Sequence, residues 1–355
     1  MAIPSITELL ERMVRMGASD LYLAAGAPAR MNVNGRFQDL TTEALSPDDC
    51  QALIRPLLDR SQWERFFEAR ELNIAYSLGE RGRFRVNVYL QRGTLASVIR
   101  QIRIDIPSCQ ELHLPPIVET LALSPRGLIL VTGATGTGKS TTMAAMIHLR
   151  ASRLEGHIVT IEDPIEYLFP HGRSLVSQRE VGIDTLSFQE ALKNALRQSP
   201  TVIYIGELRD SATVEFALHC AETGHLVLST LHSTDASQTI ERILNFFSRE
   251  HQPQVLAQLS YNLRAIISQR LIPALAGNRL PVLEILLNTA RVQEVIFKGE
   301  LGALKKIMEA GRQEGMQTFD LHLKELVEKK LVSEETAMIY ADRPSDLKLK
   351  LRGFV

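Results

Sequence analysis

The sequence predicts an α+β domain at the N-terminus, followed by a larger α/β domain that ends in helices. Up to about residue 105, short amphipathic strands and helices alternate, whereas from Gly127 onward continuously apolar strands alternate with helices. Strands of the second kind are buried on both faces, as in a sheet covered by helices. Between the two parts, Pro107 and the pair Pro115-Pro116 restrict the backbone. We therefore expect domains at residues 1–105 and 119–355, joined by a linker at 106–118.

The first domain is predicted to begin with a helix and to contain a small sheet. Ser5 and Glu8 form a capping box before apolar residues at helical spacing, and Gly17 is expected to end this helix. A turn at Asn34-Gly35 is expected to lead the chain back through Phe37. Strands are expected at residues 20–23, 31–33, 72–78, 83–91 and 95–104, and helices at 47–58 and 62–69.

In the second domain, apolar runs bounded by turn residues predict the strands of the sheet. They lie at residues 128–132, 158–161, 202–205, 226–230 and 282–287. After Thr289 the pattern is helical to the end. The alternation of such strands with helices is typical of an α/β fold.

The composition is that of an ordinary globular protein and argues against several classes. Of 355 residues, 45% are apolar and 23% charged, and the net charge of −1 disfavours non-specific nucleic-acid binding. The three cysteines, Cys50, Cys109 and Cys220, lie far apart, which suits a reducing compartment and offers no metal knuckle. No secretory signal or membrane span is recognisable. We expect a cytoplasmic protein without a nucleic-acid partner, which reaches a membrane only through partners.

A glycine-rich turn lies between a predicted strand and a predicted helix. It fits the P-loop pattern G-x-x-x-x-G-K-[ST] at each fixed position. In that motif backbone N–H groups surround a polyphosphate, the lysine reaches the β- and γ-phosphates, and the serine hydroxyl binds Mg²⁺. With ATP and Mg²⁺ as ligands, the expected binding residues are Gly133, Ala134, Thr135, Gly136, Thr137, Gly138, Lys139, Ser140 and Thr141.

Acidic residues follow two strands of the same predicted sheet. Glu162, Asp163 and Glu166 come after the strand at 158–161, and Glu207 follows the strand at 202–205. Ligands of parallel sheets bind at the carboxyl ends of strands, where carboxylates can orient or deprotonate water or hold magnesium. Glu207 has the place of a Walker B acid and is the second expected Mg²⁺ ligand. For the acids after 158–161, helix capping in a solvated turn is the alternative.

Two histidines bracket the predicted strand at 226–230. His232 follows its carboxyl end, near the expected phosphates, and is a candidate catalytic residue, although a packed or exposed structural histidine is the alternative. His225 precedes the strand, and its role is left open.

Strands of the first domain carry arginines outside the nucleotide domain. They are Arg85, Arg92, Arg100 and Arg103. Phosphoryl transfer benefits from an arginine that neutralises charge on the γ-phosphate, and such an arginine is often supplied in trans. Solvated strand faces are the alternative interpretation, since surface arginine is common.

Four ordered motifs resemble those of secretion-superfamily ATPases, the hexameric motors of type II secretion and type IV pili. Residues 133–141 match the Walker A motif, 160–166 the Asp box, 196–210 the Walker B motif and 221–232 the His box. Residues 17–20 and 315–319 add to the likeness, which covers nearly the whole chain. The resemblance implies a PAS-like N-terminal domain and a RecA-like ATPase domain with C-terminal helices.

Within that superfamily the chain is similar to the PilT/PilU retraction branch. It shows neither the longer N-terminal extension nor the four-cysteine zinc element usual in assembly and secretion ATPases. Residues 133–137, 179–185 and 286–289 and the tail past Ala341 are similar to the PilU subgroup. Where PilT proteins carry an Ala-Ile-Arg-containing helix on which retraction depends, residues 290–298 read Ala-Arg-Val-Gln-Glu-Val-Ile-Phe-Lys. This departure favours an accessory retraction motor.

By position, the resemblance implies Glu166 as catalytic carboxylate, Glu207 as Walker B acid, and Arg85 and Arg100 as paired arginines that reach the γ-phosphate. It also implies a homo-hexamer at the inner face of the inner membrane, working with an inner-membrane pilus platform protein and a paralogous PilT-type ATPase. The expected function is ATP-driven pilus retraction, hence twitching motility. Alternatives are a pilus-assembly or type II secretion ATPase, a structural partner of a second retraction ATPase, and a DNA-dependent motor, which the near-neutral charge disfavours.

Overall fold

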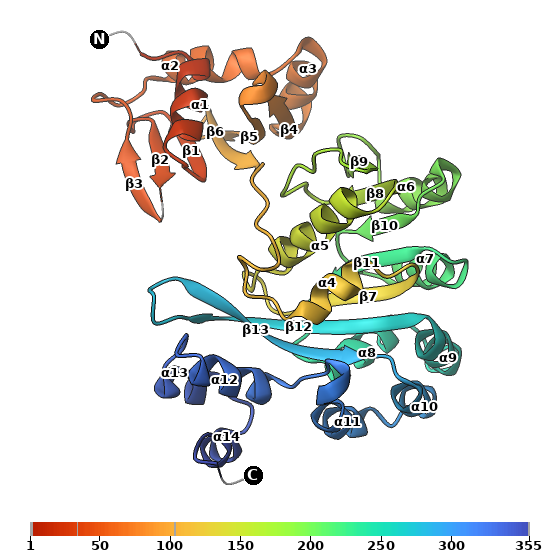
Figure 1. Cartoon of the computed structure of the whole chain (residues 1–355). Coiled ribbons are helices and arrows are strands. Elements are labelled where there is room, and N and C mark those ends of the chain that lie inside the picture. The colour runs from red at the N-terminus through yellow and green to blue at the C-terminus, as the bar shows by residue number, and fades with distance from the viewer. Residues whose placement is uncertain (1–2, 34, 103, 354–355) are drawn as a thin grey trace. The chain divides into compact units, whose positions relative to one another are not determined.

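A computed structural model of the chain describes residues 3–33, 35–102 and 104–353 and divides into two compact units (Figure 1). The first comprises Met1–Asp105 with Glu166–Leu168, and the second comprises Ile106–Ile165 with Phe169–Val355. Asn34 of the predicted turn and the candidate Arg103 lie outside the described residues.

The first unit is built around an antiparallel sheet with the strand order β3-β2-β1-β6-β5-β4. The chain begins with helix α1, whose predicted capping box between Ser5 and Glu8 is confirmed. The helices are α1 (Ile6–Arg15), α2 (Pro47–Ile54) and α3 (Arg60–Ala69), with short 3-10 turns at Arg55–Leu57 and Gly79–Arg81. The strands are β1 (Asp20–Ala24), β2 (Arg30–Val33), β3 (Arg36–Asp39), β4 (Glu71–Ser77), β5 (Arg83–Gln91) and β6 (Thr94–Ile102).

One face of this sheet packs into its own core. Along β5, Phe84, Val86 and Val88 are fully buried, as the alternation of apolar and polar residues predicts. From α1, Leu9 and Met13 enter the same cluster. Burying side chains of this size contributes about 1.5–3 kcal/mol each, so the apolar face fixes which residues of β5 and β6 point outward.

The second unit is built around a sheet with the order β13-β12-β7-β11-β10-β8-β9. Its pairs are parallel except β12 with β13, which is antiparallel. The strands are β7 (Gly127–Thr132), β8 (Gly156–Glu162), β9 (Ser174–Glu180), β10 (Val202–Ile205), β11 (Leu226–Leu231), β12 (Leu263–Pro273) and β13 (Arg279–Leu287). The five predicted strands are confirmed, whereas β9 and β12 were not predicted.

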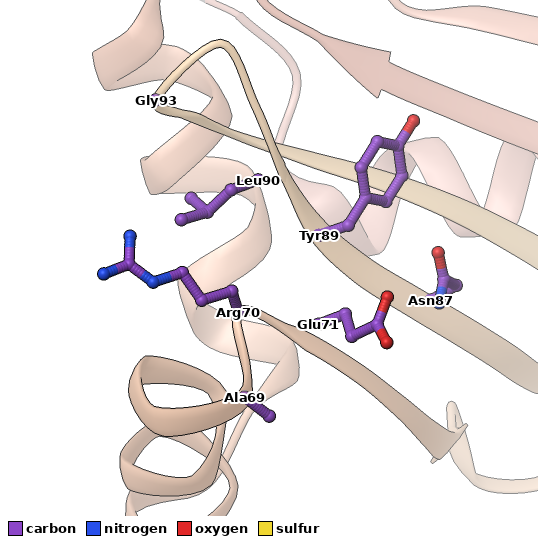
Figure 2. A pocket seen from close by; sticks show the side chains of 7 residues that line it. All are labelled: Ala69, Arg70, Glu71, Asn87, Tyr89, Leu90 and Gly93. Carbon is purple, nitrogen blue, oxygen red and sulfur yellow. The ribbon is translucent and has the colours of Figure 1, made fainter.

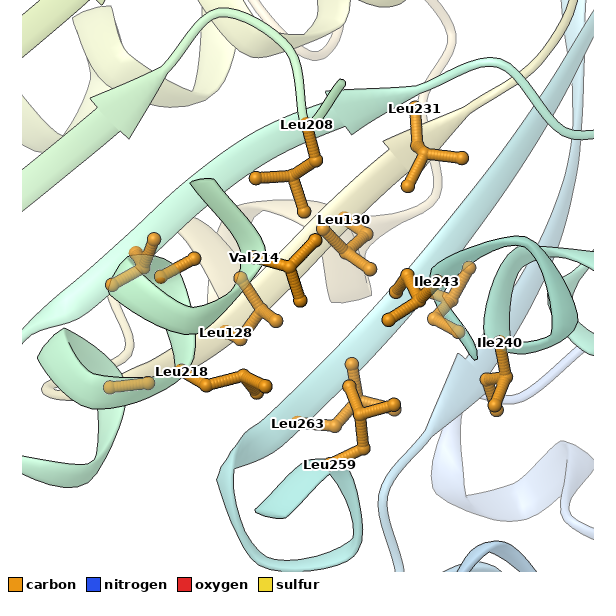
Figure 3. Close-up of a cluster of buried hydrophobic side chains, with 14 of the residues drawn as sticks. Leu128, Leu130, Leu208, Val214, Leu218, Leu231, Ile240, Ile243, Leu259 and Leu263 are labelled. Carbon is orange, nitrogen blue, oxygen red and sulfur yellow. The ribbon is translucent and has the colours of Figure 1, made fainter. Parts of the chain in front are cut away.

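Helices cover the second sheet and form the end of the chain. Apolar side chains of α6 to α10 pack with alternate strand residues such as Leu128 and Leu130 into one buried cluster. Figure 3 shows part of this cluster, with residues of β7, α7, α8 and α9 among those labelled. The predicted helical character after Thr289 is confirmed. The helices are α4 (Pro116–Ala122), α5 (Lys139–Arg153), α6 (Phe188–Ala195), α7 (Ser211–Glu222), α8 (Ala236–Leu244), α9 (Gln252–Asn262), α10 (Ala290–Lys298), α11 (Leu304–Ala310), α12 (Phe319–Glu328), α13 (Glu334–Tyr340) and α14 (Pro344–Leu351), with short 3-10 turns at Leu196–Gln198, Leu301–Ala303 and Arg312–Glu314.

The parallel register brings three strand ends to one edge of this sheet. β7 ends at Thr132, directly before the glycine-rich loop, and β11 pairs with it through Leu231. β10, which pairs with β11, ends two residues before Glu207. This edge is where ligands of parallel sheets bind. Among the described residues, no helix is long and apolar enough to cross a bilayer.

Candidate nucleotide-binding site

The backbone of the glycine-rich loop has conformations and close contacts that require glycine. Gly138 precedes α5 with φ +88°, and Gly133 has φ +151°. A Cβ on Gly133 would lie 2.5 Å from the carbonyl oxygen of Gln269. Gly138 gives α5 no side-chain cap, so the N–H groups of the first helical turn face a possible anion. This backbone fits a bound polyphosphate.

Lys139 extends along the same loop. Its Nζ donates hydrogen bonds to the carbonyl oxygens of Gly133, at 2.9 Å, and Ala134, at 3.0 Å. The side chain is largely buried, with 8% of the residue exposed. Its ammonium group thus lies against the first two residues of the loop. Ser140 follows Lys139 on the first turn of α5.

His232 connects Lys139 with Glu207. Its Nδ1 is 3.3 Å from Lys139 Nζ, and its Nε2 is 3.4 Å from Glu207 Oε1. Because an ammonium group only donates, Nδ1 accepts and Nε2 carries the proton. Burial and the neighbouring Lys139 lower the pKa of His232, which keeps the imidazole neutral. The structure thus brings three sequence-predicted site residues into one chain of contacts.

Arg209 extends this chain to the loop after β8. Its Nε donates to Glu207 Oε2 at 2.9 Å, and its Nη1 donates to Asp163 Oδ2 at 2.9 Å. The hydrogen bond with Glu207 raises the pKa of Arg209. Sequence reasoning assigned no role to this arginine. Its place two residues after Glu207, the expected Walker B acid, was the available signal.

The acids after β8 have different surroundings. Glu162 is buried, and its Oε1 accepts hydrogen bonds from Thr160 Oγ1, at 2.6 Å, and Gln178 Nε2, at 3.1 Å. Glu166 is exposed in the following loop, in the segment Glu166–Leu168 that groups with the first unit. The structure thus ties Glu162 into the fold and leaves Glu166 accessible to solvent.

In the first unit, Arg85 and Arg100 lie directly opposite each other on β5 and β6. Arg100 Nε donates to Asp20 Oδ1 at 2.7 Å, and the Asp20 side chain is 7% exposed while that of Arg100 is 65% exposed. The buried carboxylate of Asp20 therefore fixes the Nε side of the Arg100 guanidinium group, while the rest of the Arg100 side chain stays largely exposed. Arg92 lies in the β5–β6 turn with φ +50°, and its position there suits a turn residue.

Two further features lie apart from these contacts. His225 Nδ1 is 3.2 Å from both Thr223 Oγ1 and the Cys220 carbonyl, at the start of β11, so its surroundings are those of a structural residue. A pocket of about 630 Å³ in the first unit contains none of the sequence-predicted site residues (Figure 2). It is lined by Ala69, Arg70, Glu71, Asn87, Tyr89, Leu90 and Gly93. Within the described residues no cluster of metal-binding side chains occurs.

Comparison with known proteins gives a consistent result. Residues 101–339 match the family described as type II/IV secretion system protein. The type IV pilus ATPase PilU of Pseudomonas aeruginosa is 46% identical over 97% of this chain and 91% of its own length. The type IV pilus retraction ATPase PilT of the same organism is 40% identical over 96% and 99%. A crystal structure of the pilus retraction motor PilT with bound ADP superposes with a TM-score of 0.90, at 40% identity, covering 98% of this chain and 99% of that one.

A glycine-rich loop that fits the P-loop pattern, at the edge of a parallel sheet and linked through His232 to an acidic residue, is typical of P-loop ATPases. The chain belongs to the type II/IV secretion system protein family and, within it, to the PilT/PilU group of type IV pilus retraction ATPases. The resemblance inferred from the four motifs and the expected enzyme class are thus confirmed.

Proposed function

We propose that this ATPase works as a homo-hexameric motor that drives retraction of type IV pili, and that it does so as a PilU-type accessory to a paralogous PilT-type ATPase. The contacts of His232 with Lys139 and Glu207 support the hydrolytic part of this proposal, because they gather the lysine of the P-loop pattern and the expected Walker B acid at one edge of the sheet. The higher identity to PilU than to PilT, 46% against 40%, supports the accessory role.

In the proposed reaction each side chain has one task. Lys139 would bind the β- and γ-phosphates, and the oxygens of Ser140 and Glu207 would hold Mg²⁺, which prefers oxygen ligands. Glu166 orients and deprotonates the attacking water. Residues 133–141 supply backbone N–H groups to the phosphates. ATP would supply the phosphoryl group whose transfer to water drives the motor, and bound Mg²⁺ would neutralise charge on the phosphates.

Arg85 and Arg100 complete this proposed site from the first domain. They are directly opposite residues of adjacent strands, so their side chains leave the same face of the sheet. An arginine supplied in trans neutralises charge that develops during phosphoryl transfer. We assign residues 1–105 to a PAS-like domain, 106–118 to a linker and 119–355 to a RecA-like domain with C-terminal helices. A change in the angle between the domains in each cycle would convert hydrolysis into movement.

The motor would act in the cytoplasm at the inner face of the inner membrane, against a pilus platform protein. The test is a deletion strain of the host, complemented with either the intact protein or the Lys139→Ala variant. Abundant pili with reduced twitching support retraction, and loss of pili would instead indicate an assembly ATPase. Full motility with the Lys139→Ala variant would indicate a structural partner whose own hydrolysis is dispensable.

A further inference from the structure

A buried polar residue on β12 lies next to the glycine-rich loop. Gln269 is 3% exposed, inside a strand whose other residues are mostly apolar. The preceding residue, Ser268, pairs with Thr132, the last residue of β7. Gln269 therefore lies one position beyond the end of β7, where the chain leaves the sheet and enters the loop.

The side-chain amide of Gln269 makes two short hydrogen bonds. Its Nε2 donates to the carbonyl oxygen of Thr137 at 2.7 Å, and its Oε1 accepts from Thr142 Oγ1 at 2.8 Å. Because a backbone carbonyl only accepts, the amide nitrogen must face Thr137, which fixes the orientation of the group. Thr137 belongs to the loop and Thr142 to the first turn of α5, so one side chain ties both to β12.

Two glycines of the loop approach the same glutamine. A Cβ on Gly133 would lie 2.5 Å from the Gln269 backbone oxygen, and a Cβ on Gly138 would lie 2.9 Å from Gln269 Nε2. Real Cβ atoms do not tolerate contacts this short to fixed atoms. The loop is thus packed against the backbone of Gln269 at its start and against its side chain at its end.

We propose that Gln269 is a positioning residue that holds the P-loop in its phosphate-binding conformation, an inference that rests on the proposed function of residues 133–141 as the nucleotide site. A loop held in place before binding loses less freedom when it closes around phosphates. The loop contacts the phosphates in the bound state and in the transition state alike. Loss of Gln269 therefore raises KM and changes kcat little.

The test compares Gln269→Leu with the unaltered full-length protein in its native assembly. Leucine has a similar volume and makes neither hydrogen bond. Loss of two neutral hydrogen bonds predicts a rise of about tenfold in KM for ATP and in Kd for ADP, with kcat changed by less than about threefold. Wild-type KM and Kd, or a lost kcat with unchanged KM, would overturn the proposal.

Asn288→Leu is the matched control. The Asn288 side-chain amide likewise makes two hydrogen bonds, since its Nδ2 donates to the carbonyl oxygens of Ser260 at 2.8 Å and Leu263 at 2.7 Å. Leu263 pairs with Leu128, near the opposite end of β7 from the P-loop. This variant should lower the melting temperature without altering KM or Kd. If it raised both as much as Gln269→Leu does, the effect would be general loosening and the proposal would fail.

Two more variants keep the result decisive. If Gln269→Leu does not fold, Thr142→Val removes only the hydroxyl that orients the amide, and a rise of about threefold in KM and Kd is expected. An unchanged KM in that variant would then overturn the proposal. Lys139→Ala tests the nucleotide site itself. If that variant binds ADP normally the proposed site is wrong, whereas lost binding there with normal binding in Gln269→Leu refutes only this inference.

Discussion

His232 lies between Lys139 and Glu207, with Nδ1 3.3 Å from the lysine ammonium and Nε2 3.4 Å from the carboxylate. The three residues come from α5, the end of β11 and the end of β10, and the imidazole is the group that links them. Its lowered pKa, caused by burial and by Lys139, favours the neutral imidazole that this bridge needs.

Removing the imidazole should slow hydrolysis without unfolding the protein. The His232 side chain is 38% exposed, so His232→Ala leaves little cavity. Loss of the bridge frees Lys139 and Glu207 from their mutual alignment, and we expect kcat to fall by roughly tenfold to a hundredfold. The check is steady-state phosphate release, with His225→Ala as control. His225 has only structural contacts at the other end of β11, so its variant should retain kcat. A wild-type kcat for His232→Ala would contradict this role.

The ion pair between Asp20 and Arg100 should matter for hydrolysis although it lies in the first unit. Asp20→Asn keeps the side-chain shape and weakens the hold on a guanidinium proposed to meet the γ-phosphate. A hydrogen bond to a charged group contributes about 1.5–3 kcal/mol, so weakening it should lower kcat about tenfold.

Asp39→Asn provides a matched control in the same sheet, because Asp39 Oδ1 accepts from Arg30 Nε at 2.6 Å in an exposed pair. Exposed pairs contribute little, so this variant should hydrolyse ATP normally. Equal rates for the two variants would show that the buried pair has no special part in the reaction.

Glu284 should make stability depend on pH. Burial raises the pKa of Glu284 to about 7. The hydrogen bond that the Ala236 N–H donates to Glu284 Oε1 at 2.9 Å has a smaller, opposite effect. An unfolded glutamate titrates near 4.3, so the folded state holds the proton more tightly, and this stabilisation is lost as pH rises through about 7. As the pH rises from 4.5 to 8, the free energy of unfolding of the Glu284→Gln variant should therefore increase by about 3 kcal/mol relative to that of the original protein.

Denaturant unfolding of both proteins at several pH values provides the measurement. Burial lowers the pKa of His322 to about 4, so this histidine makes stability rise with pH. The effect is the same in both proteins and cancels in the difference between their free energies of unfolding. A difference that stays constant with pH would mean that Glu284 does not titrate in this range.

Much of the site was predictable because its chemistry is local in the sequence. Three features indicated the same edge of the sheet: the glycine spacing, Glu207 after one apolar run and His232 after another. The contacts of His232 with Lys139 and Glu207 agree with that prediction. The roles of Glu166, Arg85 and Arg100 stay predictions, because they depend on contacts that no single stretch of sequence encodes.

The strands β9 and β12 were missed for a physical reason. β9, Ser174–Glu180, is mostly polar and forms the edge of the sheet, so it has no apolar run. In β12, Ser268 and Gln269 interrupt the pattern, yet both are buried because Thr132 and Thr142 satisfy their polar atoms. This part of the site was not predicted from the sequence.

The most direct test of the proposed motor asks whether one subunit's arginines serve another subunit's P-loop. Lys139→Ala subunits lack a working P-loop, and subunits with Arg85→Ala and Arg100→Ala lack the arginines, so each should be inactive alone. In rings mixed one to one, about a quarter of the sites would pair an intact P-loop with intact arginines from a neighbour. We predict that ATP turnover reappears on mixing, and turnover that stays at the level of the separate variants would contradict the account.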